Sequence, residues 1–355
     1  MTSFFLLDKR RYPALDGLRA VATVMIFNVH FFAQFSEPNY FLDSGSLGFQ
    51  MIRTFHSGSL GVDILFLLSG CLTYLSFSRN VRIPVHTFMT HRFKRLLPVI
   101  LVVNLPALCW GADSVGWRQL VDNIFFFKFF PETTLVSYIT WALIYEMWFY
   151  VFFCAVFILP QRWAFSRGWA YFWTVNALLV ANILYFNTLR PYNDPRFLDF
   201  MVGILLTRFL LDTRLHARLD RLSSLLWLPG ALAILAACWL WSTESFHAVM
   251  GSSPPSRLGF HLLFAAATAA LFWRLLRPGA ATTLLSYAPL RVVGVVSYSL
   301  FMTHAQWGLP ISGGFLGSVS SFPGVLAAWG VSFGVSLLLA TLLFTLLERP
   351  YFVKP

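Results

Sequence analysis

Long apolar runs recur along this chain, and they restrict its fold more than any other feature. Ten stretches are long enough to cross about 30 Å of hydrocarbon as α-helices. They cover residues 15–35, 59–78, 96–111, 138–159, 169–187, 196–211, 223–241, 257–276, 291–309 and 323–347. Of the 355 residues, 57% are hydrophobic and only 12% are charged, whereas charged residues make up about 25% of an ordinary soluble domain. We therefore predict an all-α, polytopic membrane helix bundle of about ten transmembrane helices.

The basic residues give this bundle a direction. With both termini in the cytoplasm, roughly 20 of the 26 lysines and arginines fall in cytoplasmic loops and helix ends, as the positive-inside rule requires. A miscounted helix would reverse every later loop and remove this asymmetry. The net charge of +11 is then explained by topology, and we expect no nucleic acid among the partners.

Residues 1–355 are predicted to form a single membrane domain with no appended soluble domain. No internal repeat or low-complexity linker divides the chain. The four cysteines lie inside or at the ends of predicted helices, and no pair has the spacing of metal ligands. We therefore expect neither disulfides nor a bound metal.

The first apolar stretch carries two polar residues whose spacing is informative. Arg19 and His30 are eleven residues apart, which on an α-helix is a rotation of about 1100° and a rise of about 16 Å. Both side chains therefore share one helix face at two depths. A topogenic arginine and a histidine hydrogen-bonded inside the bundle are the alternative to a functional pair.

Further ionisable residues fall at one predicted depth. Measured from the cytoplasmic end of each helix, His30, Asp63, Glu146 and His304 lie at about 20–22 Å, and Asp199 lies at about 18 Å. Ionisable groups at bilayer depth are costly unless they are paired, so each is a candidate functional residue. The layer predicts catalysis or transport, and a polar network that only fixes helix packing is the alternative.

A second polar group lies at the predicted cytoplasmic surface. Arg92 and Arg95 are three residues apart and share a helix face. As part of the positive-inside pattern they need no ligand, but together with Arg19 they can clamp phosphate groups through guanidinium forks. A ligand with phosphates at one end and a reactive group about 15 Å away would join these arginines to His30. Coenzyme A thioesters have this shape.

Six motifs in chain order resemble those of the membrane acyltransferase-3 family. They are Asp16-Gly-Leu-Arg-Ala-Val-Ala22 with His30, Gly61–Gly70, Phe88 with Arg92-x-x-Arg95 and Pro98, Trp141–Glu146 with Tyr150, Ser297–His304, and Glu348-Arg-Pro350. The resemblance covers nearly the whole chain. Cys71, Leu65, Ala142 and Thr303 depart from the residues usual in the family, but the charged positions are kept.

The resemblance implies an integral-membrane O-acyltransferase. Such proteins transfer an acyl group, usually acetyl, from cytosolic acyl-CoA to a hydroxyl of an extracytoplasmic or lipid-linked glycan. The expected cofactor is acetyl-CoA, and the expected partners are acyl-CoA, a glycan or lipid-linked glycan, and membrane lipid. The expected location is the inner (cytoplasmic) membrane of a bacterium.

These expectations assign roles to individual residues. Arg19, Arg92 and Arg95 bind the CoA phosphates, and the thioester reaches His30. His30 either deprotonates the acceptor hydroxyl or carries the acyl group transiently.

Four further residues complete the predicted site. Asp63 or Glu146 orients His30, because a carboxylate fixes the tautomer of a neighbouring imidazole and stabilises its protonated form. His304 and Trp141 position the acceptor.

Two other functions fit parts of this pattern. A transporter or flippase of a lipid-linked glycan would use the same charged layer to relay protons or to bind sugars, although the inverted repeats common in transporters are not evident. A catalytically inactive scaffold would show no phenotype when His30 is replaced by alanine.

Overall fold

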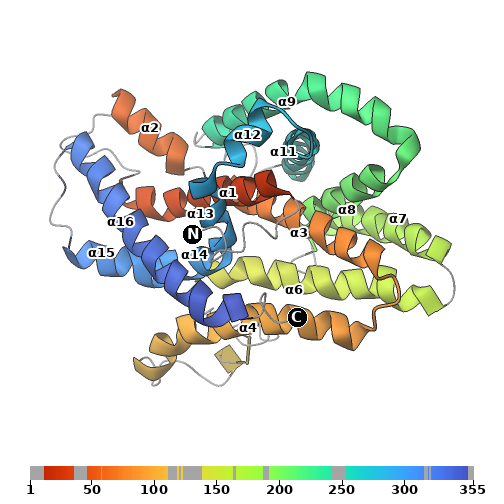
Figure 1. The fold of residues 1–355 in the computed structure, drawn as a ribbon, viewed down its shortest axis with the longest axis horizontal. Helices are drawn as coiled ribbons and strands as arrows, with labels where there is room; N and C mark the ends of the chain where they lie inside the picture. The colour runs from red at the N-terminus through yellow and green to blue at the C-terminus, as the bar shows by residue number, and fades with distance from the viewer. Residues whose placement is uncertain are drawn as a thin grey trace.

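The structure is a computed structural model, and it describes residues 12–35, 46–56, 58–110, 118–119, 121–122, 138–162, 165–186, 192–241, 253–315, 319 and 321–350. These residues contain helices and connecting segments and no β-strand (Figure 1). The α-helices are α1 (Pro13–Phe32), α2 (Leu47–His56), α3 (Leu60–Arg79), α4 (Val85–Trp110), α6 (Trp141–Phe153), α7 (Phe165–Ala181), α8 (Phe197–Leu211), α9 (Thr213–Trp241), α11 (Pro254–Leu275), α12 (Ala280–Leu285), α13 (Ala288–Val295), α14 (Ser297–Thr303), α15 (Leu309–Phe315) and α16 (Phe322–Leu343). The all-α prediction is confirmed for this part of the chain.

Several helices are suited to a membrane. In the described residues, seven helical segments are long and apolar enough to cross one by length and composition. The predicted helices 96–111, 196–211 and 291–309 are not among them. The first is the second half of α4, the second is the short helix α8, and the third is divided among several short helices. The total of ten crossings and the side on which each terminus lies stay predictions.

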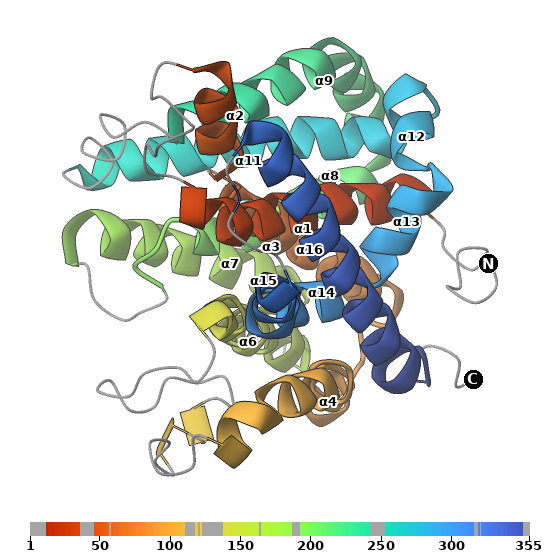
Figure 2. The same cartoon turned by 90° about the vertical axis from the view of Figure 1, so that its left-hand side faces the viewer.

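Helix α3 lies at the centre of the bundle, between α1 and α8 (Figure 2). A side chain at Gly61 would collide with the carbonyl oxygen of Ala22 in α1, and one at Gly70 would collide with the carbonyl oxygen of Phe200 in α8. Nine residues separate the two glycines, which is a rotation of about 900°, or two and a half turns. The two glycines therefore lie on opposite faces of α3, and each lets a neighbouring backbone approach closely.

Aromatic stacking holds α6 against the same core. The rings of Phe66 in α3 and Phe149 in α6 stack on the ring of Phe200 in α8, with centroid distances of 4.4 and 4.3 Å. All three side chains are buried, and stacked rings at this distance add to the stabilisation that comes from apolar burial. One face of α3 is thereby fixed relative to α6.

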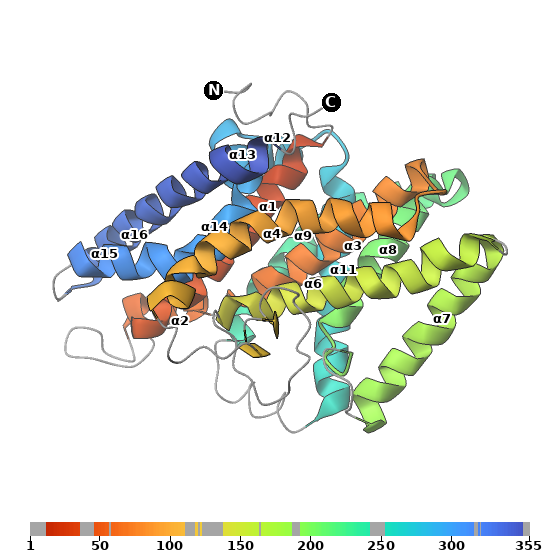
Figure 3. The same cartoon turned by 90° about the horizontal axis from the view of Figure 1, so that it is seen from below.

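The predicted helix 291–309 is broken into α13, α14 and a π-helical turn, His304–Gly308, that leads into α15 (Figure 3). Pro310, the second residue of α15, has no amide hydrogen to donate to a carbonyl four residues earlier. A π-helical turn is a common way to relieve such a defect, and it is frequent at functional sites. His304 is the first residue of this turn, and it faces α1.

Candidate active site

Two histidines from opposite ends of the chain are in contact. His30, near the end of α1, places its Nδ1 2.7 Å from Nε2 of His304. The ring centroids are 4.9 Å apart, and the planes are inclined by 31°. His304 is fully buried and His30 is half-buried. The structure thus joins two of the histidines that the sequence placed at one depth.

The hydrogen bonds define which nitrogen carries the proton in a neutral pair. Nδ1 of His304 lies 3.0 Å from the carbonyl oxygen of Leu300, and a carbonyl only accepts, so this Nδ1 carries the hydrogen. Nε2 of His304 then accepts from Nδ1–H of His30. Nε2 of His30 therefore holds the lone pair, and this nitrogen can take a proton or attack a carbonyl carbon.

A cavity beside this pair contains the three arginines that the sequence assigned to the cofactor. Arg19 of α1 and both Arg92 and Arg95 of α4 line it. The cavity also extends along α3, where the lining positions follow one another every three or four residues and therefore share one helix face. These positions are Val62, Leu65, Phe66, Ser69, Leu72 and Thr73, and Leu68 lines the cavity as well. A basic region and an apolar region are thus parts of one cavity.

Local contacts fix the basic end of the cavity. The guanidinium of Arg92 donates to Oγ1 of Thr73 at 3.3 Å, and it lies over the rings of Phe88 and Tyr150, 5.1 and 4.9 Å from their centroids. Cation–π contacts of this kind hold a guanidinium in place while leaving its edge able to donate. Arg92 is therefore oriented before any ligand binds.

Glu146 lies in the wall of the same cavity. Its Oε1 accepts hydrogen bonds from the hydroxyls of Ser69, at 3.0 Å, and of Tyr150. Arg95 interacts electrostatically with Glu146. The contacts described for Glu146 therefore associate it with the arginines rather than with His30, to which the sequence assigned it as one of two possible orienting carboxylates.

Phe301 connects the cavity with the histidine pair. Its side chain is buried and lines the cavity, and its ring centroid is 6.1 Å from that of His304. Phe301 therefore lies between the arginine-lined cavity and His304.

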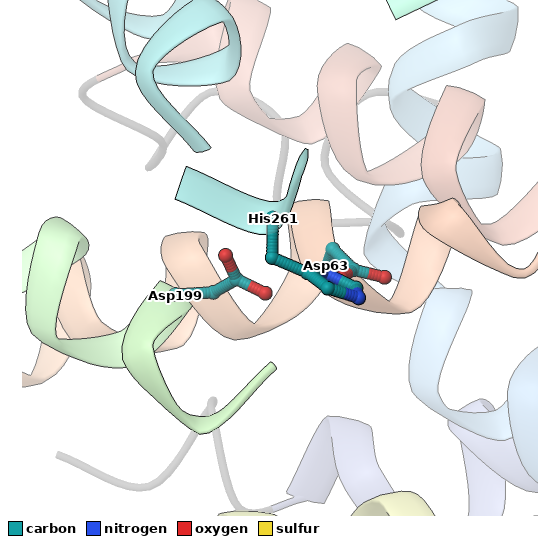
Figure 4. A group of neighbouring side chains, drawn as sticks. All are labelled: Asp63, Asp199 and His261. Atoms are coloured by element: carbon teal, nitrogen blue, oxygen red, sulfur yellow. The ribbon is translucent and has the colours of Figure 1, made fainter. Parts of the chain in front are cut away.

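Asp63 belongs to a different cluster, on another face of α3. Oδ1 of Asp63 lies 2.8 Å from Nδ1 of His261 in α11, and Oδ2 lies 3.5 Å from Nε of Arg196. Asp199 of α8 completes the cluster, in which one potential ligand atom each from Asp63, Asp199 and His261 lies within 4.8 Å of the others (Figure 4). All three side chains are buried.

The rotation of α3 explains why Asp63 faces this cluster. Gly61 faces α1, and Asp63 follows two residues later, at a rotation of about 200°. Asp63 and Gly70 differ by seven residues and therefore share the face toward α8. The sequence assigned Asp63 to His30 as the other possible orienting carboxylate, but the contacts described for Asp63 are with α8, α11 and Arg196.

Trp141, assigned to acceptor positioning, lies beside this second cluster. The guanidinium carbon of Arg196 is 5.5 Å from the centroid of the Trp141 ring and 5.8 Å from that of Trp241. Two tryptophans thus enclose Arg196, and the ring of Trp141 also meets Tyr145 edge-on at 5.4 Å.

Sequence analysis assigned no role to three residues that lie in or next to these groups, namely His261, Arg196 and Glu348. His261 and Arg196 lie near the ends of predicted helices that also bear outer-layer residues, and the depth rule that selected Asp63 and Asp199 would have selected His261 as well. Glu348, buried in the final helical turn, accepts a hydrogen bond from Oγ of Ser299 at 2.5 Å and interacts electrostatically with Arg95. Its motif was noted in the sequence, but no role was assigned to it.

Comparisons with known proteins agree with the motifs. A family model described as an acyltransferase domain matches residues 12–345. The peptidoglycan O-acetyltransferase OatA of Listeria monocytogenes is 23% identical over 331 residues, which cover 83% of this chain and 49% of that protein. The exopolysaccharide production protein ExoZ of Rhizobium meliloti is 24% identical over 172 residues, which cover 45% of this chain and 53% of that protein.

The regions that match this chain make up about half the length of each of these relatives. No solved structure matches it.

Proposed function

The chain belongs to the acyltransferase-3 family. From this premise we propose that it transfers an acyl group, most simply acetyl, from acyl-CoA to a hydroxyl of a glycan. The observation that carries this proposal is the single cavity lined by Arg19, Arg92, Arg95 and Glu146, which lies against the histidine pair through Phe301.

The arginines suit the phosphates of coenzyme A. Guanidinium groups bind phosphate through two parallel hydrogen bonds, and three of them can neutralise the several charges of this ligand. Helix α1 is unbroken between Arg19 and His30, so their difference of eleven positions gives an axial separation of about 16 Å. An extended pantetheine arm covers a distance of this order, which would bring the thioester past Phe301 to His30.

The tautomers favour His30 as the reacting base. In direct transfer, the acceptor hydroxyl gives its proton to Nε2 of His30 while its oxygen attacks the thioester carbonyl carbon. The carbon–sulfur bond then breaks, and the CoA thiolate takes the proton from the imidazolium. His304 holds His30 in the required tautomer and shares the positive charge, the role that a carboxylate has in hydrolase triads.

A transient acyl-histidine starts from the same lone pair. Nε2 of His30 attacks the thioester carbonyl carbon, and CoA leaves as a thiolate. The acceptor hydroxyl then attacks the acyl carbon, the acyl–nitrogen bond breaks to restore His30, and the hydroxyl proton neutralises the thiolate. Radiolabelled acyl group retained on the protein without acceptor would support this two-step route, and its absence in a single turnover would exclude it.

The names of the relatives support a glycan acceptor. One is a peptidoglycan O-acetyltransferase and another an exopolysaccharide production protein. We propose a surface or lipid-linked glycan as the acceptor, with the protein in the bacterial inner membrane and its donor site open to the cytoplasm.

The test uses the purified full chain in sealed lipid vesicles with acetyl-CoA and a set of glycans, and follows the release of free thiol, the mass of the glycan and its movement across the bilayer. We expect acceptor-dependent thiol release and a glycan mass increase of one acetyl group. Glycan movement across the bilayer with no thiol release for any acceptor would overturn the proposal in favour of a flippase.

A further inference from the structure

The cluster of Asp63, Asp199 and His261 has features of a ligand site that the acyl-transfer chemistry does not use. The three residues come from α3, α8 and α11, and their side chains converge (Figure 4). None of them lines the cavity that holds the arginines. We propose that these three side chains bind a divalent transition-metal ion of the Zn²⁺ class.

The charges around the cluster leave a deficit of positive charge. Asp63, Asp199 and the nearby Asp194 bring three carboxylates, and Arg196 is the cation paired with them in the described residues. Asp194 accepts hydrogen bonds from the hydroxyl of Tyr145 at 2.9 Å and the backbone amide of Arg196 at 3.0 Å. A divalent cation would offset this excess of carboxylates, and buried charges in proteins are paired or bound to metals.

Two carboxylate oxygens in the cluster are buried and have acceptor capacity to spare. Oδ2 of Asp199 accepts no hydrogen bond from any residue in the described part of the chain, and there Oδ2 of Asp63 has only the 3.5 Å ion-pair contact with Nε of Arg196. Both side chains are about 1% exposed. A buried carboxylate oxygen without a donor costs several kcal/mol of desolvation, and a metal ion would remove this cost.

The donor set selects the class of metal. Two carboxylate oxygens and one imidazole nitrogen are ligands of Zn²⁺, whereas Ca²⁺ takes six to eight oxygen ligands. A tetrahedral ion with metal–ligand bonds of about 2.0–2.2 Å holds its ligand atoms about 3.3–3.6 Å apart. The potential ligand atoms of Asp63, Asp199 and His261 lie within 4.8 Å of one another, and a bound ion would replace the hydrogen bond between Asp63 and His261. The sequence-based expectation of no metal rested on cysteine spacing and did not consider this set.

Such an ion would tie three helices together. A neighbouring face of α3, with Val62, Phe66 and Ser69, lines the cavity that holds the arginines. Bound metal would therefore stabilise the helix that forms one wall of that cavity, without contacting the acyl donor.

The test measures metal directly. The full chain, purified in detergent without a histidine tag and stripped with chelator, is dialysed against Zn²⁺ and analysed for elemental zinc. Co²⁺ is titrated in parallel, because its visible absorption reports protein ligands. We expect one zinc ion per chain and a cobalt band, and we expect Asp199→Asn and His261→Gln each to weaken binding at least about tenfold.

Two matched controls replace the same residue types elsewhere. Asp212→Asn removes a carboxylate that pairs with Arg208 on the far end of α8, and His86→Gln removes an exposed histidine. Both should bind zinc and cobalt like the wild type. Wild-type protein that retains no zinc and shows no cobalt band would overturn the proposal and leave a proton shared by Asp63 and Asp199 as the way the charge is removed. Equal binding by the Asp199 and Asp212 variants would also overturn it.

Discussion

His304 and His261 are both buried histidines, but the groups around them differ in charge. His304 contacts another imidazole and a backbone carbonyl, whereas His261 contacts a carboxylate that also pairs with a guanidinium. The neutral pair lies next to the arginine-lined cavity, from which Phe301 separates it. The charged cluster lies on the face of α3 that is turned toward α8 and α11. A His–Asp pair resembles a catalytic dyad, yet here the pair with no carboxylate adjoins the candidate cofactor site. We propose that the neutral pair carries out the chemistry and that the charged cluster holds helices together.

The largest expected effect is on the neutral pair. His30→Ala should lower kcat for acyl transfer by about 10²–10⁴-fold, because it removes the proton-accepting nitrogen, and should leave the melting temperature near that of the wild type. Thiol release by purified protein measures the rate. His86→Gln, an exposed histidine, is the control and should match the wild type. Wild-type turnover in His30→Ala would remove this residue from the mechanism.

Substitutions in the charged cluster should instead lower the stability of the protein. Asp63→Ala leaves Arg196 and His261 without their carboxylate, and removing one partner of a buried ion pair costs about 3–5 kcal/mol of unfolding free energy. The melting temperature in detergent should fall clearly. Asp212→Asn breaks a partly exposed pair and should cost less than about 1 kcal/mol. If both variants melt alike, the structural role of the cluster is wrong.

Substitutions at the basic end of the cavity should weaken the binding of acetyl-CoA. Arg92→Ala should raise KM for acetyl-CoA by about 10–100-fold, because a hydrogen bond to a charged group contributes about 1.5–3 kcal/mol. Arg92→Lys should be intermediate, since an ammonium cannot make the bidentate contact. Arg79→Ala removes an exposed arginine from the end of α3 and controls for net charge. An unchanged KM in Arg92→Ala would mean that the phosphates bind elsewhere.

His304 tests whether orientation matters within the neutral pair. His304→Leu removes the acceptor for Nδ1–H of His30 and should lower kcat about tenfold, the effect of roughly one hydrogen bond. His304→Gln keeps a side-chain oxygen that can accept and should recover part of the rate. Equal rates for the two variants would show that His304 does not act through its acceptor.

The smallest effect should follow from Phe301→Ala, which enlarges the cavity next to His304. Burying one methylene is worth about 0.8 kcal/mol, so the ratio of propionyl-CoA to acetyl-CoA turnover should rise about fourfold. A ratio equal to that of the wild type would place the acyl group away from Phe301.

The sequence predicted the parts that depend on one helix alone. Hydropathy located α1, α3 and α16 to within a few residues, and helical spacing placed Arg19 and His30 on one face of an unbroken α1. The positive-inside pattern placed Arg92 and Arg95 at the level of Arg19, and one cavity contains all three.

Contacts between helices were beyond this reasoning. Depth rules put Asp63 level with His30, but depth does not say which way a side chain turns around its helix axis. The break in 291–309 depends on Val296, which connects α13 to α14, and on the π-helical turn at His304, and hydropathy does not detect such a turn.

The glycine contacts of α3 have a consequence for motion. Gly203 of α8 lies against the carbonyl oxygen of Leu67, as Gly61 lies against that of Ala22, so three helix backbones touch with no side chains between them. Rocking one helix against another, as alternating access in transporters requires, would have to open these contacts. The geometry favours a rigid frame, and under the proposed function the acyl donor and the acceptor would both travel to a stationary centre.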